Sequence, residues 1–212
     1  MKHIEKKAEL QTLTRHRLQP HAGYDNYVEK DELRAALLSE QGGICCYCMQ
    51  RISMAEIKVE HFASQKKYPH RRLEYDNLLA ACLGGQGSPR HLQHCDTHKG
   101  DDDIKLNPTD GVRNCEHFVR YAPDGRIYSD HADINCDLHT TLNLNLQTLK
   151  SNRKAVLDGA IEVLRRRRPD GQWVRAFLEA AKKKWQGRGR DGSYAPYCQI
   201  VVVYLDRKLR RL

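Results

Sequence analysis

The spacing of apolar residues predicts short strands in the first half of the chain and long helices in the second. Residues 27–40 carry apolar side chains at helical spacing and end before a glycine pair, which predicts a helix. Residues 57–59 alternate apolar and polar and lead into Glu60 and His61, and residues 77–82 predict a second strand. A further helix is predicted to begin at Cys95 and to carry Asp96 back toward Glu60.

The second half of the chain is predicted to be mainly helical. Asp124-Gly125 lies between apolar stretches, which indicates a hairpin. An apolar stripe from Leu149 to Leu164 predicts a helix that stops at Pro169, and a second amphipathic helix follows over residues 173–185. Residues 197–205 are rich in β-branched side chains, yet their apolar positions also fit one helical face, so a buried final helix is favoured over a strand.

The chain of 212 residues is long enough to bury its own core and is predicted to form a single domain. We divide it into an N-terminal arm and helix over 1–40, a central core over 41–108 and a mainly helical part over 109–212. Residues 1–26 show no clear periodicity and are expected to lie as an arm over the surface. The longest apolar run covers residues 200–204, far short of the roughly 20 needed to cross a bilayer, and no secretory signal is recognisable. A cytoplasmic protein without membrane contact is therefore expected.

Four of the eight cysteines have the spacing of metal ligands. Two residues separate Cys45 from Cys48, so a tight turn can aim both sulfurs at one ion. Twelve residues separate Cys82 from Cys95, in a loop rich in Gly, Ser and Pro that allows them to converge on the same ion. Four thiolates predict a closed, structural zinc site rather than a catalytic one.

Two alternatives to the four-thiolate site remain open. The first cysteine pair also has the spacing of a thioredoxin-like redox motif, but no strand–helix–strand context surrounds it. One of His91, His94 and His98 is an alternative ligand in place of a thiol. The remaining cysteines are expected to be small buried or half-buried residues; they are Cys46, Cys115, Cys136 and Cys198.

The chain carries a net charge of +9 and has a pI near 9.2, which favours a polyanionic partner such as nucleic acid. A basic loop with interleaved tyrosines covers residues 62–76, and we expect its cations to contact phosphate; they are Lys66, Lys67, Arg71 and Arg72. Lys99 is a further candidate for such a contact. The run Arg165 to Arg168 fits a nucleic-acid contact and a solvated helix end equally well.

Between Cys48 and Cys82 lie Glu60-His61 and then Asn77-Leu78. A Cys-x-x-x-Lys segment follows from Cys95 to Lys99. This order resembles the HNH endonuclease family. The opening MKHIEKK, the phrases LSEQ, KGD and LNP, and the later LNLN are similar to the HNH component of Septu-type anti-phage systems, often called PtuB and also found beside some retrons. The resemblance covers most of the chain.

The resemblance implies an α+β, mostly helical fold. Its centre would be a ββα-metal core of the HNH, treble-clef-like type with a structural zinc knuckle, packed on N- and C-terminal helices. It also implies that His61 is the general base, that Glu60 and Asp96 hold a catalytic Mg²⁺ or Mn²⁺, and that Asn77 fixes the loop that orients His61. Two positions depart from the family pattern: Asp96 stands where a histidine is usual, and no proline follows the His61 motif closely. His98 is retained as an alternative metal ligand or phosphate contact.

The implied function is metal-dependent hydrolysis of phosphodiester bonds in DNA or a tRNA-like RNA, as the effector of antiviral defence. The implied partners are a PtuA-like ATPase and, in a retron setting, a reverse transcriptase with its RNA and DNA. A zinc-stabilised nucleic-acid-binding or scaffold module without catalysis is the alternative. The residues do not distinguish DNA from RNA, and they give neither the trigger nor the stoichiometry.

Overall fold

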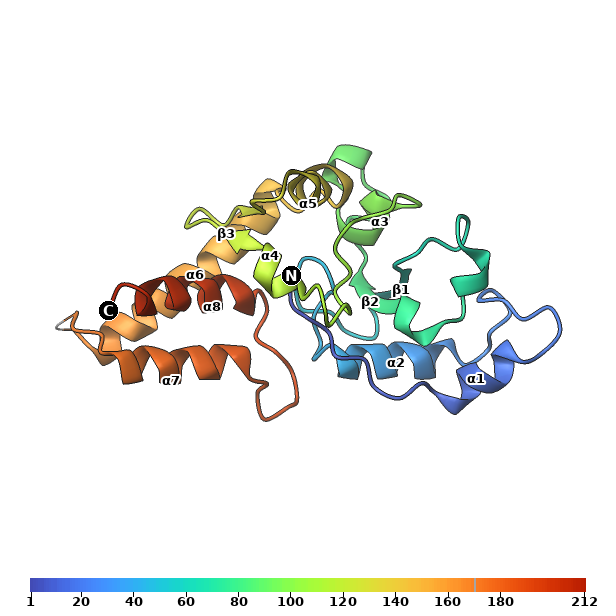
Figure 1. The fold of residues 1–212 in the computed structure, drawn as a ribbon, viewed down its shortest axis with the longest axis horizontal. Helices are drawn as coiled ribbons and strands as arrows, with labels where there is room; N and C mark the ends of the chain where they lie inside the picture. The colour runs from blue at the N-terminus through green and yellow to red at the C-terminus, as the bar shows by residue number, and fades with distance from the viewer. Residues whose placement is uncertain (170) are drawn as a thin grey trace.

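A two-stranded antiparallel sheet lies at the centre of the first half of the chain (Figure 1). The computed structural model describes residues 1–169 and 171–212. In it, β1 (Ile57–His61) pairs with β2 (Leu78–Cys82) in a register that sets Ile57 opposite Cys82 and His61 opposite Leu78. Every residue of β2 is buried, as its unbroken run of small and apolar side chains predicts. Both predicted strands are confirmed.

Helices form most of the remaining structure, as predicted. The α-helices are α1 (Gln11–Arg17), α2 (Lys30–Glu40), α3 (Cys95–Lys99), α4 (Cys115–Phe118), α5 (Ala132–Cys136), α6 (Gln147–Arg167), α7 (Arg175–Gln186) and α8 (Cys198–Leu209). Shorter elements are the 3₁₀ turns Pro69–Arg71, Tyr75–Asn77 and Arg90–Leu92, the π-helical turn Asp137–Thr141, and the strands β3 (Arg120–Tyr121) and β4 (Ile127–Tyr128). The protein is therefore of the mixed α+β class, with two small sheets among many helices.

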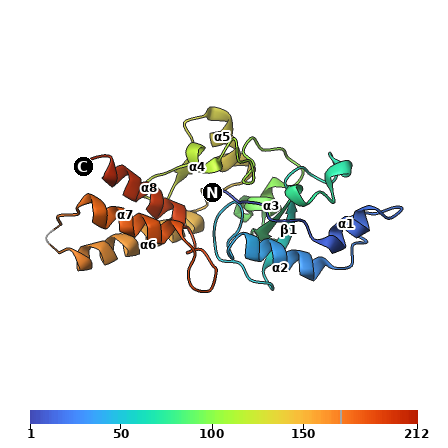
Figure 2. The ribbon, with the colours of Figure 1, turned by 60° about the horizontal axis from the view of Figure 1, so that its bottom comes forward.

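The elements separate into two regions that lie at opposite ends of the molecule. Figure 1 shows α1, α2, β1 and β2 on the right and the long helices α6, α7 and α8 on the left, and the turned view in Figure 2 keeps the same separation. Helices α7 and α8 pack against each other, and Lys182 of α7 forms an ion pair with Asp206 of α8 at 2.5 Å. None of the helices in residues 1–169 and 171–212 is long and apolar enough to cross a membrane.

The turn after α2 holds the first cysteine pair against the sheet. Gly42 and Gly43 adopt left-handed backbone conformations that reverse the chain, and Ile44 then forms a bridge to Arg51. The side chain of Gln41 donates to the carbonyl of Ala80 at 2.8 Å and accepts from its amide at 2.7 Å. Because Ala80 is the middle residue of β2, this pair of bonds fixes the turn to the centre of the sheet.

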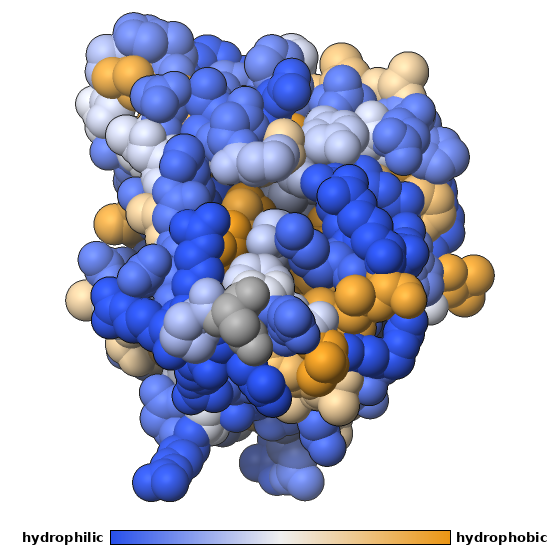
Figure 3. Space-filling view, turned by 90° about the vertical axis from the view of Figure 1, so that its left-hand side faces the viewer, coloured by the Kyte–Doolittle hydropathy of each residue, from blue (hydrophilic) through white to orange (hydrophobic). Residues whose placement is uncertain are grey.

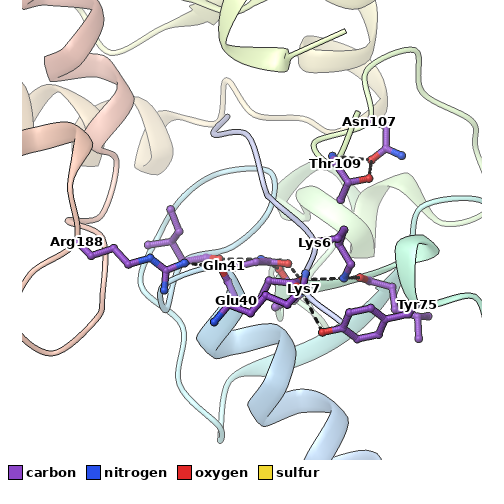
Figure 4. Close-up of polar contacts among 11 residues, drawn as sticks. Lys6, Lys7, Glu40, Gln41, Tyr75, Asn107, Thr109 and Arg188 are labelled. Atoms are coloured by element: carbon purple, nitrogen blue, oxygen red, sulfur yellow. Dashed lines mark hydrogen bonds and ion pairs between the residues drawn. The ribbon is translucent and has the colours of Figure 1, made fainter. Parts of the chain in front are cut away.

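Glu40 joins the N-terminal segment to this turn (Figure 4). Its carboxylate is 3% exposed and accepts from the Lys6 ammonium at 2.7 Å, the Lys7 amide at 2.6 Å and the Tyr75 hydroxyl at 3.2 Å. Arg188 approaches from the C-terminal half and donates to the Glu40 carbonyl at 2.6 Å. A buried carboxylate with three donors is a fixed anchor point, so the N-terminal segment is held in place.

The N-terminal residues are not the surface arm that the sequence predicted. Met1, Ile4 and Leu13 are buried in the core, and Gln11–Arg17 forms a helix. The Ile4 amide donates to the carbonyl of Pro108 at 2.9 Å. The prediction failed because the segment buries isolated apolar residues against distant parts of the chain rather than a periodic face of its own.

The remaining element predictions agree with the structure apart from their boundaries. Helix α2 begins at Lys30 instead of residue 27, and α7 begins at Arg175, so Trp173 lies before it. The hairpin at Asp124-Gly125 is confirmed by β3 and β4. Residues 198–209 form the favoured helix α8, whose buried face includes Val201 and Leu205.

The two regions meet through the backbone near the start of α8. The Tyr194 amide donates to the Gly42 carbonyl at 2.9 Å, and the Tyr197 amide donates to the Met49 carbonyl at 3.0 Å. Arg153 of α6 is fully buried nearby and donates to the carbonyls of Gly125 and Leu144 at 2.5 and 2.6 Å. The cysteine turn is therefore completed by chain about 150 residues further along.

Candidate functional site

Four cysteine thiols gather at one buried point, as the spacing predicted. The sulfurs of Cys45, Cys48, Cys82 and Cys95 all lie within 4.8 Å of one another. The distance from Cys45 Sγ to Cys95 Sγ is 3.9 Å, and from Cys48 Sγ to Cys82 Sγ it is 3.8 Å. Tetrahedral zinc with Zn–S bonds of about 2.3 Å requires S···S separations of about 3.8 Å. The cluster therefore fits a zinc ion.

The loop between Cys82 and Cys95 folds back on itself to bring the two thiols together. Gly84 has φ +57°, and a Cβ there would lie 2.2 Å from the His94 carbonyl, so only glycine fits. The His94 amide donates to the Gly84 carbonyl at 2.9 Å and closes the loop. The Cys95 amide donates to Leu142 at 2.9 Å, which fixes the start of α3 against the C-terminal half.

The electrostatics of the cluster favour a cation. Burial opposes ionisation of Cys45, but hydrogen bonds from the surrounding thiols outweigh it and hold its pKa well below the usual thiol range. Burial and the Cys45 thiolate raise the pKa of Cys95 well above that range. The buried thiols thus differ in how readily they lose a proton, and a bound cation would favour the thiolate form of all four.

Neighbouring side chains support the cluster without replacing a thiol. His94 Nδ1 lies 3.1 Å from Cys95 Sγ and 4.0 Å from Cys82 Sγ, while His98 Nδ1 lies 3.0 Å from the carbonyl of Thr141. His98 therefore contacts a backbone oxygen of the C-terminal half. Of the other cysteines, Cys136 is exposed, which contradicts the expectation that it would be at least half-buried.

Glu60 is a buried carboxyl group at the end of β1. It is 2% exposed, and its Oε1 accepts from the Tyr47 hydroxyl at 2.7 Å and lies 2.9 Å from Lys99 Nζ. Its side chain is also in hydrogen-bond contact with Asp96 of α3. Burial and then Asp96 raise the pKa of Glu60 well above its usual value, although Lys99 acts in the opposite direction.

Asp96 completes a carboxyl pair with Glu60, as the predicted start of α3 implied. Burial opposes its ionisation, but the hydrogen bond from Glu60 and the Lys58 ammonium, 2.7 Å from Oδ2, lower the pKa of Asp96. The two carboxyl groups therefore lie in direct contact. Paired carboxylate oxygens are the ligands that Mg²⁺ and Mn²⁺ prefer, so the chemistry of the pair suits a divalent cation.

His61 follows Glu60 and has one ring nitrogen anchored. Its Nε2 lies 3.0 Å from the Arg72 carbonyl, which can only accept, so Nε2 carries the proton and Nδ1 is left as the basic nitrogen. The Tyr24 ring packs edge-on against the imidazole with centroids 4.7 Å apart. Burial is the main reason why the pKa of His61 falls to about 4, so the ring is neutral at pH 7.

Asn77 ties together the loop on both sides of the basic segment. Its Oδ1 accepts from the Ala63 amide at 2.7 Å, and its Nδ2 donates to the carbonyls of Ala63 and Arg71, each at 3.0 Å. The residue is fully buried. Since Arg71 precedes Arg72, whose carbonyl anchors His61, Asn77 fixes the backbone that positions the imidazole.

The predicted basic loop is largely neutralised by neighbouring acids. Lys67 lies 3.4 Å from Asp103, and Arg71 lies 2.7 Å from Glu74. Lys66 remains mostly exposed, 4.0 Å from Asp101, while the Arg72 guanidinium donates to the Ala22 carbonyl at 2.5 Å.

Lys99, predicted as a phosphate contact, does not reach the surface. Its side chain is fully buried, and its ammonium contacts Glu60 and the His61 carbonyl, the latter at 3.3 Å. Sequence reasoning missed this pairing and the hydroxyl of Tyr47, because both depend on how the cysteine turn folds over β1. The position of Tyr47 inside the first cysteine pair was the available signal, since a turn that binds metal must place that side chain somewhere nearby.

The sequence was compared with known proteins. It matches no family model. It is 34% identical over 132 residues to a protein of Escherichia coli named as the candidate HNH endonuclease of retron Ec83, covering 52% of this chain and 51% of that protein. It is 26% identical over 157 residues to the candidate HNH endonuclease of retron Vc95 from Vibrio cholerae, covering 70% of this chain and 74% of that one. The first match thus spans about half the length of the relative.

Proposed function

We propose that the protein is a metal-dependent endonuclease of the HNH type that hydrolyses phosphodiester bonds in nucleic acid. The observations that carry the proposal are the anchored, neutral imidazole of His61 and, one residue before it on β1, the buried carboxyl group of Glu60 in hydrogen-bond contact with Asp96. The similarity to two retron-linked HNH endonuclease candidates supports the same activity. In this proposal β1, β2 and α3 form the ββα-metal core, and the four cysteines hold structural zinc.

His61 is the general base of the proposed reaction. With Nε2 donating to Arg72, the unprotonated Nδ1 accepts a proton from the attacking water, and the imidazole needs no prior deprotonation at neutral pH. The Tyr24 ring and the Asn77 bonds hold the ring in one orientation. Such positioning matters because a base acts only within hydrogen-bond reach of the proton.

Glu60 and Asp96 would hold the catalytic Mg²⁺ or Mn²⁺. A bound divalent cation supplies positive charge to phosphate oxygens and to the leaving group. The residues of this chain then have separate tasks: Tyr47 and Lys99 fix Oε1 of Glu60, and Lys58 orients Asp96. Attack in line with the leaving 3′ oxygen would produce 5′-phosphate and 3′-hydroxyl ends.

The proposed setting is anti-phage defence in the cytoplasm. The two relatives are named for retrons, and the sequence phrases shared with Septu-type proteins suggest control by a PtuA-like ATPase. The ATPase would restrain the nuclease until infection, and a retron reverse transcriptase with its RNA and DNA would join the complex. DNA and a tRNA-like RNA are both retained as substrates.

The test is cleavage by the purified chain, alone and with the products of neighbouring genes. Plasmid DNA and total tRNA are incubated with Mg²⁺, and His61→Ala is expected to reduce the cleavage rate at least about 10²-fold. His70→Ala removes an exposed histidine of the same loop and should leave the rate unchanged. If the wild type cuts neither nucleic acid in any combination, the non-catalytic binding or scaffold module is the better explanation.

A further inference from the structure

The excess positive charge of the chain lies entirely in its last quarter. Residues 162–212 contain 14 of the 36 Lys and Arg residues and only 5 of the 27 Asp and Glu residues. Residues 1–161 contain 22 of each sign and are formally neutral. The net charge of +9 therefore belongs to the end of α6, to α7 and α8, and to the segments that join them.

Part of this charge gathers around two adjoining hollows at the far end of the helical region (Figure 3). Arg165 and Arg168 line the first, which has a volume of about 590 Å³, and Arg211 lines the second, of about 440 Å³. Trp173 and Lys208 belong to both. Figure 3 shows that hydrophilic side chains cover most of this face and that apolar ones form a smaller band beside them. We call this surface the basic end.

The cations of the basic end have few acidic partners. Arg166 forms an ion pair with Glu162 at 3.0 Å, but Arg165, Arg168, Lys208 and Arg211 have no carboxylate within 4.0 Å among the residues that the structure describes. The ammonium of Lys208 instead lies over the rings of Trp173 and Tyr204, 5.8 and 5.6 Å from their centroids. Aromatic faces hold a cation in place without neutralising its charge.

Helix dipoles account for only part of this arrangement: Lys208 lies in the last turn of α8, as Arg165 does in that of α6, but Arg168 and Arg211 follow the last residues of these helices. The dipole of α6 favours cations in its own last turn, which covers Arg165 to Arg167. Lys208 and Arg211 come from α8 and the residues after it, yet they line the same pair of hollows. The cations of two helix ends are thus brought to one surface, and the phosphates of nucleic acid are spaced to meet several such cations.

We infer that the basic end binds the sugar–phosphate backbone of nucleic acid, as a second contact at the opposite end of the molecule from the carboxyl pair. Trp173 forms an apolar wall between the two hollows, and Arg165, Arg168, Lys208 and Arg211 contact phosphates on either side of it. Contacts to phosphate alone carry no sequence information, so the surface holds a strand without selecting its sequence. The inference extends the proposed nuclease, but it concerns binding alone and does not require cleavage.

The test measures binding to a 20-nucleotide single strand and a 20-base-pair duplex in EDTA, which keeps cleavage out of the assay. Fluorescence anisotropy is recorded from 50 to 200 mM KCl for His61→Ala and for the same chain with Arg165→Gln, Arg168→Gln, Lys208→Gln and Arg211→Gln. Loss of four phosphate contacts lowers the slope of log K against log salt by about 3. The affinity at 100 mM KCl is expected to fall at least about tenfold, since each contact contributes to the same electrostatic attraction.

A matched control removes four exposed cations from the neutral region, with Arg15→Gln, Arg90→Gln, Lys105→Gln and Arg113→Gln. It should leave the slope within about 1 of the parent, whereas equal losses in both variants would overturn the inference, as would an unchanged slope in the quadruple variant. Equal thermal unfolding and zinc content establish that the variants are folded. If the chain binds through the basic end but cleaves no nucleic acid, only the proposed nuclease activity is contradicted. If the wild type cleaves nucleic acid and the quadruple variant keeps the salt slope of the parent, only this inference is contradicted.

Discussion

The two ends of the molecule differ in the balance of their positive and negative side chains. Residues 1–161 carry as many acids as bases, and buried carboxyl groups there form ion pairs, as in Glu60 with Lys99 and Glu40 with Lys6. Among the described residues of 162–212, most cations are exposed and form no ion pair; Arg166, Arg175 and Lys182 are the exceptions. A site that must hold one cation and one phosphate in a fixed geometry needs local balance, whereas a surface that holds a polyanion needs an excess of one sign.

The same contrast separates the two basic stretches that the sequence singled out. The loop over 62–76 is dense in Lys and Arg, but its cations Lys67 and Arg71 contact Asp103 and Glu74. In the run from Arg165 to Arg168 only Arg166 forms an ion pair, with Glu162, among the residues that the structure describes. Clusters of positive residues in a sequence therefore do not establish a positive surface until the acids that fold beside them are known.

Removal of zinc should have the largest effect and should separate the two regions most clearly. Structural zinc contributes about 10–16 kcal/mol in small zinc-binding folds, as much as or more than the stability of a typical domain. We expect chelation, or Cys82→Ser, to abolish hydrogen-exchange protection of β2 and α3. Protection at the contact between α7 and α8, which is remote from the thiols, should largely remain. Cys136→Ser removes an exposed thiol and should change nothing, while simultaneous loss of protection at both ends would mean that the regions form one cooperative unit.

Disruption of the Glu40 anchor should have an intermediate effect that is confined to the neutral region. Glu40→Gln leaves the Lys6 ammonium largely buried without a counter-charge, which we expect to cost about 2–3 kcal/mol in urea unfolding. The double variant with Lys6→Met should recover part of this loss, because removal of both partners leaves no unpaired charge. Glu5→Gln, at an exposed site, is the control. A single variant as stable as the wild type would show that the anchor is not needed.

The smallest effect is expected at Glu162, which is the one acidic residue among the described residues that line the basic end. Glu162 pairs with Arg166 on an exposed helix surface, so Glu162→Gln should change the free energy of unfolding by at most about 0.5 kcal/mol. Its removal should nevertheless raise the affinity for single-stranded nucleic acid about twofold at 100 mM KCl, as an added positive charge does. Asp158→Asn, which removes the similarly placed partner of Lys154, should not change the affinity.

The sequence predicted the elements whose cause is local. The alternation at residues 57–59, the stripe of α6 and the hairpin at Gly125 each depend on neighbours within a few residues, and all three are confirmed. Cysteine spacing likewise predicted the convergence of four thiols, because tetrahedral ligation restricts the possible turns.

The parts that failed depend on contacts between distant residues. Lys99 reads as one more surface cation, and only the packing of α3 against β1 shows that it is the buried partner of Glu60. Met1 and Ile4 lack a periodic pattern because they enter a core built by other segments. The roles of His61, Asn77 and the carboxyl pair in catalysis remain predictions, although the structure pairs Glu60 with Asp96 and anchors His61 to the loop that Asn77 holds.

The backbone bonds from Tyr194 and Tyr197 to the cysteine turn also impose an order on assembly in the cell. A ribosome adds about 5–20 residues per second, so the turn near Gly42 waits roughly 8–30 s for the strand that completes it. During that interval Cys45 and Cys48 have been synthesised, but Tyr194 and Tyr197, whose amides bond to the turn around them, have not. A nascent chain therefore lacks these two backbone hydrogen bonds until translation has passed residue 197.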